Sequence, residues 1–269
     1  MIKIPELKNL ICNQQGSVLN VTLNRPEKLN AFDMDMFEGL RQVAEIVSNE
    51  RDIRMVVFKG AGRAFSCGAD LSGVMSRQNH AEIPVDANND DDVIAQGMKN
   101  IQGVFDRVEN IPKPTIASIN GHAVGAGLQL ALACDFRIAS KGAKLGLTDV
   151  KIGIIPGLGG TTRLPLLIGL ARAKEIIMTG DLISSQEAVN IGLVNQVVEG
   201  NDLDKAVQEL TEKLISRAPL ALAAAKDLLN TGASLDRVAK IQSNLIRSSD
   251  AIEGMTAFLE KRTPNFSGC

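Results

Sequence analysis

Residues 115–130 read TIASINGHAVGAGLQL, and ACDFR at 133–137 and IIPGLGG at 154–160 follow closely. The apolar run 115–119 leads into a glycine-rich turn, and helix-forming residues follow the turn. Such a turn leaves backbone N–H groups free at the N-terminus of a helix, where they can hold negative charge. The stretch therefore predicts a strand at 115–119, a turn suited to an anion, and a helix at 125–133.

The composition is that of an ordinary globular protein. The 269 residues allow one large domain or two small ones, and 45% hydrophobic with 22% charged residues excludes a disordered chain. The formal net charge of −2 argues against a protein that wraps nucleic acid or lies on an anionic membrane. We therefore expect neither nucleic acid nor a membrane as a partner.

Cysteines, histidines and the N-terminus bear on cofactors and compartment. The four cysteines show no CxxC spacing, which favours reduced thiols in a cytoplasmic protein. With only two histidines, a His-based metal site is not expected. The first residues, MIKIPE, have no long apolar core, so we expect neither a signal peptide nor a membrane span.

Strands alternate with helices first, and helices alone follow. We expect a helix from Asp33 and a polar surface loop over 72–100 that enters a helix near Val93. The expected strands are 17–23, 53–58, 115–119, 136–139 and 193–198. The expected C-terminal helices are 203–215, 220–229, 235–246 and 251–260. This order predicts an α/β core with a helical C-terminal region.

From about residue 17 to 266 the chain resembles the crotonase (enoyl-CoA hydratase/isomerase) superfamily, through its glycine-rich core and the loop at Pro156. The resemblance implies a ClpP-like spiral of ββα repeats, with an acyl-CoA-binding core at 1–200 and a helical trimerisation region at 201–269. It also implies a homotrimer or a dimer of trimers. The substrate would be an acyl-CoA thioester, and coenzyme A would enter with it, so no separate cofactor is expected.

In this family two segments each give one backbone N–H to the thioester carbonyl oxygen. The segments here are RAFSCGAD at 63–70 and GAG at 125–127, and the resemblance places the donors at Cys67 and Ala126. Removal of an α-proton builds charge on that oxygen, and losing one such donor costs about 2.7–4 kcal/mol. The alternative is a pair of glycine-rich turns without a ligand.

The acid pair departs from the hydratase pattern. Gln129 stands where the hydratases carry the first Glu, and the second family acid falls on Asp149. A glutamine donates and accepts hydrogen bonds but is no proton base at pH 7. Isomerases of the superfamily keep only the second acid, and this pattern fits better. A hydratase would need Gln129 to position water while Asp149 does all proton transfer.

The remaining site residues are carried over from the resemblance. Lys28 would face the CoA phosphates, backbone near Ala31 and Ala69 the adenine, and Asp70 and Leu71 the pantetheine tunnel. In FLEKR at 258–262, Phe258 and Lys261 would reach the CoA of a neighbouring subunit, with Lys261 on its 3′-phosphate. Gly157 stands where some isomerases carry an Asp. The rest of the expected substrate-binding set is Gly68, Gly125, Gly127, Pro156 and Gly157.

Two functions of different classes stay open. The first is an acyl-CoA enzyme of hydratase/isomerase type in fatty-acid or related catabolism, with Asp149 as its single acid/base. The second is a catalytically weakened acyl-CoA-binding or scaffold protein, which the replacement at Gln129 motivates. An RNA-binding role, known for a few superfamily members, has no basic stripe to support it. The loop at 72–100 is the least family-like part, and we expect it to set acyl selectivity.

Overall fold

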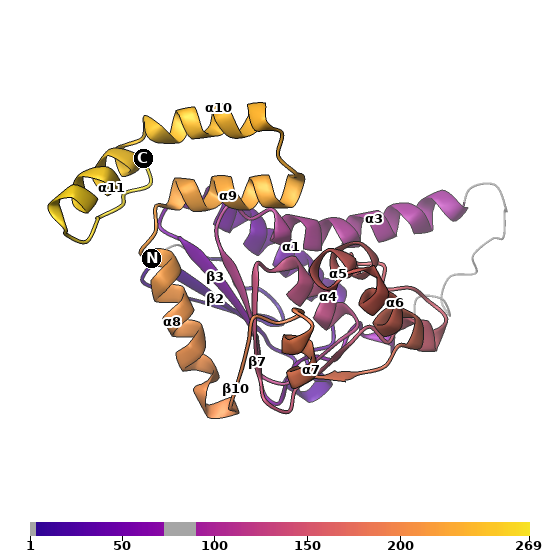
Figure 1. Cartoon of the computed structure of the whole chain (residues 1–269). Coiled ribbons are helices and arrows are strands. Elements are labelled where there is room, and N and C mark those ends of the chain that lie inside the picture. The colour runs from indigo at the N-terminus through magenta and orange to yellow at the C-terminus, as the bar shows by residue number, and fades with distance from the viewer. Residues whose placement is uncertain (1–3, 73–89) are drawn as a thin grey trace.

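A computed structural model describes residues 4–72 and 90–269. Its centre is a six-stranded sheet with the order β1-β2-β3-β5-β7-β10 (Figure 1). The β1–β2 pair is antiparallel, and the other neighbours run parallel. The strands are β1 (Leu10–Gln15), β2 (Val18–Leu23), β3 (Met55–Gly60), β5 (Thr115–Ile119), β7 (Phe136–Ser140) and β10 (Gln196–Val198).

The inner strands of this sheet are covered on both faces. Alternate side chains of β3 pack in opposite directions, with Val56 and Phe58 in the large central core and Met55 and Val57 in a smaller core against helix α8 (Leu203–Ile215). All five residues of β5 are buried. Near-continuous apolar runs are typical of parallel strands with helices on both faces.

A second sheet of four short strands lies beside the first. Its order is β4-β6-β8-β9, with β8 and β9 antiparallel. The strands are β4 (Ala64–Ser66), β6 (His122–Val124), β8 (Lys144–Gly146) and β9 (Ile183–Ser184). Each of the parallel strands β3, β5 and β7 is followed along the chain by one strand of this second sheet. The α/β class expected from the sequence and the ββα pattern implied by the resemblance are therefore confirmed.

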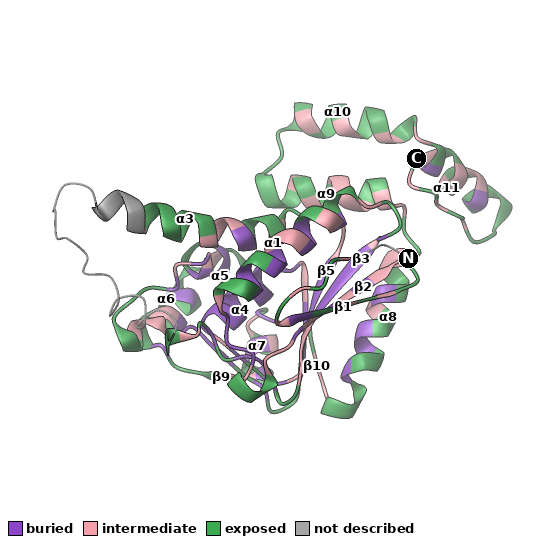
Figure 2. Cartoon of the chain, turned by 180° about the vertical axis from the view of Figure 1, so that it is seen from behind, coloured by how far each residue is buried: buried purple, intermediate pink, exposed green. Residues whose placement is uncertain are grey.

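Helices pack around the two sheets (Figure 2). Helix α1 begins after Asp33, whose carboxylate accepts a hydrogen bond from the Met36 N–H at 2.9 Å and so caps the helix. The helices of the core are α1 (Met34–Asn49), α3 (Asp90–Glu109), α4 (Ala126–Ala133), α5 (Gly160–Ile168), α6 (Leu170–Thr179) and α7 (Ser185–Asn190). Three short 3-10 helices join them: η1 (Pro26–Lys28), η2 (Asp149–Ile152) and η3 (Gly200–Asp202).

The last two helices leave the body of the protein. Helix α9 (Pro219–Thr231) lies along the core, whereas α10 (Leu235–Ile246) and α11 (Ser249–Glu260) extend away from it (Figure 1). Neither α9 nor α10 has a fully buried residue. Among the described residues, no helix is long and apolar enough to cross a bilayer.

The predicted elements were found with boundaries shifted by a few residues. Helix α3 begins at Asp90 rather than near Val93, and most of the loop predicted at 72–100, residues 73–89, lies outside the described part of the chain. The sequence analysis did not predict β1, the short strands of the second sheet, or helices α5, α6 and α7.

Candidate active site

The turn before α4 requires glycine. Gly125 has φ 52° and ψ −121°, a conformation that residues with a Cβ rarely adopt, and its N–H donates to Gly146 O at 2.9 Å. Every residue of α4 is buried, so the N-terminus of the helix is held at a fixed place inside the protein.

The two glycine-rich segments meet at this turn. Gly68 has φ 114°, and a Cβ built on it would lie 3.8 Å from Ala126 N and 3.9 Å from Gly125 Cα. A Cβ on Gly127 would lie 2.5 Å from Ser66 O, so that glycine allows the close approach of the two backbones.

Backbone pairing decides which N–H groups are free. A parallel bridge joins Phe32 and Ala69: Phe32 N–H donates to Gly68 O at 2.8 Å, and Asp70 N–H donates to Phe32 O at 2.9 Å. The N–H of Ala69 therefore points away from Phe32, because successive N–H groups of an extended chain alternate in direction. Within residues 4–72 and 90–269, neither this N–H nor that of Ala126 has a hydrogen-bond acceptor.

The N–H of Cys67 is not available. It donates to Leu29 O at 3.0 Å, and the thiol contacts Lys28 O at 3.5 Å. The prediction of Cys67 as an oxyanion donor is therefore wrong. The Cys67 N–H is occupied because the backbone at Cys67 pairs with the backbone at Leu29. The spacing of residues in the sequence cannot show this pairing.

Gln129 has a defined orientation. Its side chain is buried, and its Oε1 accepts hydrogen bonds from Leu158 N–H at 2.7 Å and Gly160 N–H at 3.0 Å. Because both donors fix the oxygen, the amide nitrogen faces Asp149, with Nε2 at 3.5 Å from Oδ1. Gln129 thus presents a donor, not an acceptor, to the carboxylate.

Asp149 turns its other oxygen toward the glycine turn. A Cβ on Gly125 would lie 3.8 Å from Asp149 Oδ2, and that oxygen is buried without a partner among the described residues. Burial raises the pKa of the Asp149 carboxyl above its usual value. A carboxylate oxygen without a partner, beside free N–H groups, can exchange a proton with a ligand bound there.

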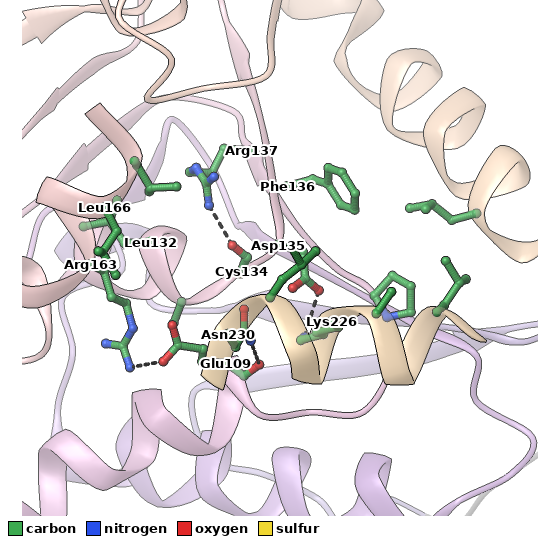
Figure 3. A pocket seen from close by; sticks show the side chains of 17 residues that line it. Glu109, Leu132, Cys134, Asp135, Phe136, Arg137, Arg163, Leu166, Lys226 and Asn230 are labelled. Carbon is green, nitrogen blue, oxygen red and sulfur yellow. Dashed lines mark hydrogen bonds and ion pairs between the residues drawn. The ribbon is translucent and has the colours of Figure 1, made fainter. Parts of the chain in front are cut away.

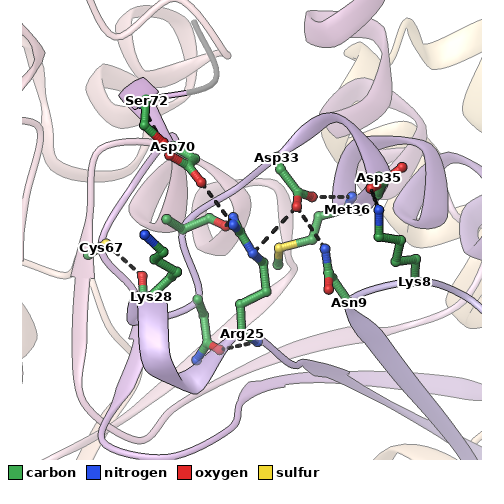
Figure 4. A network of polar contacts seen from close by, with 12 residues as sticks. Lys8, Asn9, Arg25, Lys28, Asp33, Asp35, Met36, Cys67, Asp70 and Ser72 are labelled. Atoms are coloured by element: carbon green, nitrogen blue, oxygen red, sulfur yellow. Dashed lines mark hydrogen bonds and ion pairs between the residues drawn. The ribbon is translucent and has the colours of Figure 1, made fainter. Parts of the chain in front are cut away.

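The residues expected to contact CoA lie on neighbouring loops (Figure 4). Arg25 holds these loops together: Nη1 donates to Ala31 O at 2.6 Å, and Nη2 pairs with Asp70 at 2.8 Å. Hydrogen bonds from Ser72 and from Arg25 lower the pKa of Asp70 to about 2, so it is charged at neutral pH. Lys28 is exposed, as is Leu71.

Phe258 and Lys261 do not join this group. Phe258 is 83% exposed on α11 and Lys261 is its exposed C-cap, and α11 lies far from α4 in both overall views (Figures 1 and 2). Within one chain they therefore lie away from the turn at Gly125.

A cavity of about 450 Å³ lies elsewhere, beneath α9 (Figure 3). Asp135 lines it and accepts hydrogen bonds from Thr115 N–H at 2.8 Å and from Lys226 Nζ at 2.8 Å. Neither Gln129 nor Asp149 lines the cavity. The described residues also hold no group of three His, Cys, Asp or Glu side chains that could bind a metal.

Known proteins resemble this chain over most of its length. The family described as Enoyl-CoA hydratase/isomerase matches residues 13–269. The short-chain-enoyl-CoA hydratase of Clostridium acetobutylicum is 38% identical over 267 residues, covering 96% of this chain and 97% of that one. The crotonyl-CoA hydratase of Syntrophomonas wolfei is 35% identical over 266 residues, with 96% and 98% covered.

The fold agrees with this match. The crystal structure of an enoyl-CoA hydratase from Bacillus anthracis superposes with a TM-score of 0.88 at 38% identity, covering 97% of this chain and 100% of that one. The protein is thus an enzyme with the crotonase fold. The chain belongs to the enoyl-CoA hydratase/isomerase family.

Proposed function

We propose that this enzyme moves a proton on an enoyl-CoA thioester, with Asp149 as its single acid/base. In this proposal the N–H groups of Ala69 and Ala126 hold the thioester oxygen. Asp149 Oδ2 removes the α-proton of a 3-enoyl-CoA and returns it at the γ-carbon, so the double bond shifts with no net change in atoms. The observation that supports this proposal most directly is the orientation of Gln129, which offers Asp149 an N–H and no second carboxylate.

Hydration is the second candidate, and the names of the relatives favour it. The C. acetobutylicum and S. wolfei relatives are both named as hydratases. In a hydratase, Gln129 Nε2 would orient a water molecule that Asp149 activates. A catalytically weakened acyl-CoA-binding protein is the remaining alternative.

We also propose that substrate binding uses the loops at Lys28, Ala31 and Gly68–Leu71, together with Pro156 and Gly157. Lys261 and Phe258 would then act on a neighbouring subunit's CoA in a homotrimer or a dimer of trimers. The exposed apolar side chains of α9–α11 support this assembly; they include Leu229, Leu235, Phe258 and Leu259. Sedimentation of the purified protein tests it.

Incubation in D₂O with crotonyl-CoA and, separately, with a 3-enoyl-CoA tests the reaction. Mass spectrometry of the products is the measurement. A shifted double bond with deuterium and without added water supports isomerisation. A gain of one water from crotonyl-CoA assigns hydration instead. Bound but unchanged thioesters in both samples would overturn the proposed activity and favour the binding protein.

A further inference from the structure

The loop that holds Gln129 is itself held by helix α3. Gln102 in α3 donates from Nε2 to Gly157 O at 2.7 Å. One turn further along the same helix lies Asp106, and Glu109 follows on the same face. These two carboxylates accept from Arg163 Nη2 at 2.5 Å and 2.8 Å, and Figure 3 shows the pair of Arg163 with Glu109.

Arg163 links these two carboxylates of α3 to the loop at 157–160. Its Nη1 donates to Leu158 O at 3.1 Å, and only 7% of its side chain is exposed. A Cβ on Gly159 would lie 1.8 Å from the same Nη1, so the guanidinium is packed directly against the loop backbone. Two adjacent carbonyl groups of the loop, at Gly157 and Leu158, are thus fixed from α3.

The peptide group between Gly157 and Leu158 is bound on both sides. Gln102 binds its carbonyl oxygen, and Gln129 Oε1 accepts from its N–H. A trans peptide is planar, with its C=O and N–H pointing in opposite directions, so fixing the first fixes the second. Gln102 therefore directs the N–H that holds Gln129, although it contacts neither Gln129 nor Asp149.

We infer that Gln102 and Arg163 are positioning residues for the acid site. Gln102 fixes the peptide whose N–H holds Gln129 Oε1, and Arg163 fixes the carbonyl of the next peptide, so that the loop keeps the Gln129 amide turned toward Asp149. The inference rests on the proposed function of Asp149. Without a fixed loop, the amide can rotate and present its oxygen to the carboxylate. The N–H donated to Asp149, which favours the charged carboxylate, is then lost.

Among the described residues, no charged side chain pairs with Asp149. Lys151, two residues beyond Asp149, pairs with Asp181 at 2.9 Å. In that part of the chain, the side-chain hydrogen-bond partner of Asp149 is Gln129, and its other oxygen has none.

Gln102→Met removes the donor while keeping the length of a neutral side chain. Gln186→Met is the matched control, since Gln186 is exposed on helix α7 and its side chain donates within that helix, to Asn190 Oδ1 at 3.2 Å. Arg163→Lys is a second variant, which keeps a positive charge but cannot reach all three partners with one nitrogen. Each is compared with the full-length wild type.

Two readouts are needed. The first is hydrogen exchange at the Leu158 and Gly160 amides, which reports the loop whether or not the enzyme turns over. The second is kcat, KM and the pH profile for the enoyl-CoA that the wild type converts. For Gln102→Met we expect roughly tenfold faster exchange and about tenfold lower kcat, with KM changed little, since small misplacements can cost up to about 10²-fold. The acid limb of the pH–rate profile should move to higher pH, and Gln186→Met should change none of these quantities.

Arg163→Lys should change the same quantities in the same direction. Unchanged exchange in both variants overturns the inference, and so does faster exchange with an unchanged kcat and pH profile, which would mean a merely structural role. Should the wild type convert no enoyl-CoA, the proposed function fails. The orientation of the Gln129 amide, read from its side-chain NMR signals in wild type and Gln102→Met, then decides the positioning separately.

Discussion

Gln129 Nε2 faces Asp149 Oδ1 across 3.5 Å, and the amide cannot turn without breaking two hydrogen bonds from the loop backbone to its oxygen. The site therefore holds one carboxylate and one fixed amide. The site lacks a second proton base. The Gln129 amide stands in the place of that base and points toward Asp149.

Gln129→Glu should raise the rate of crotonyl-CoA hydration. One oxygen of the new carboxylate would accept from Leu158 and Gly160, as the amide oxygen does, and the other would face Asp149, where one water could donate to both carboxylates. Added general-base catalysis typically contributes about 10²–10⁴-fold, and we expect a gain at the lower end because Asp is shorter than Glu. The hydration rate is followed by loss of enoyl absorbance.

The control is Gln186→Glu, which places the same change on the exposed face of α7. It should leave hydration unchanged. A lower hydration rate in Gln129→Glu would refute the argument that an acid is missing.

Asp149→Asn should reduce turnover by at least about 10²-fold, since it removes the proposed proton carrier. Affinity for the CoA thioester should stay within a few-fold, because the backbone N–H groups remain. Single-turnover kinetics and calorimetric binding measure the two effects. Asp181→Asn, which alters a surface acid paired with Lys151, is the control. Normal turnover in Asp149→Asn would remove Asp149 from the mechanism.

Asp149→Asn should also change how the free energy of unfolding depends on pH. Burial raises the pKa of Asp149 in the folded state above its unfolded value, so the folded protein is penalised once this group ionises. The penalty is absent below the unfolded pKa and grows as pH rises through the folded pKa. The free energy of unfolding of Asp149→Asn minus that of the wild type should therefore increase with pH over that window.

Urea titrations at several pH values measure this difference. A difference that stays constant with pH, or falls as pH rises, would show that the carboxyl is not destabilised by burial.

The sequence predicted the parts of the site that depend on local chemistry. The turn at Gly125 needs a glycine, and the pattern from 115 to 133 placed a strand and a helix around it. The resemblance supplied Gln129 and Asp149 as neighbours, and they face one another in the structure. These features follow from backbone sterics and residue order.

Other parts depend on tertiary pairing. The bond from Cys67 N–H to Leu29 O joins residues far apart in the chain, and spacing alone could not show which N–H groups remain free. The role of Gln102 was invisible for the same reason, since it contacts the loop through one backbone oxygen. The short strands of the second sheet carry too few residues for a clear period-2 pattern.

Gly125→Ala should abolish turnover. The same substitution at a second glycine, Gly142, separates the loss of binding space in the site from the strain of a positive φ. A Cβ at Gly125 would lie 3.6 Å from Gly68 Cα and 3.8 Å from Asp149 Oδ2, in the space between the free N–H groups and the acid. The positive φ adds strain of about 1–3 kcal/mol. Gly142 also has a positive φ, of 89°, but a Cβ there would meet nothing within 4 Å.

Gly142→Ala should therefore lower the thermal midpoint, as Gly125→Ala does, while keeping kcat/KM near that of the wild type. Thermal melts and steady-state kinetics of the two variants make the comparison. If both variants lose activity in proportion to their loss of stability, the space beside Gly125 is not where the thioester binds. If Gly125→Ala alone loses activity while still folded at the assay temperature, the turn is part of the site.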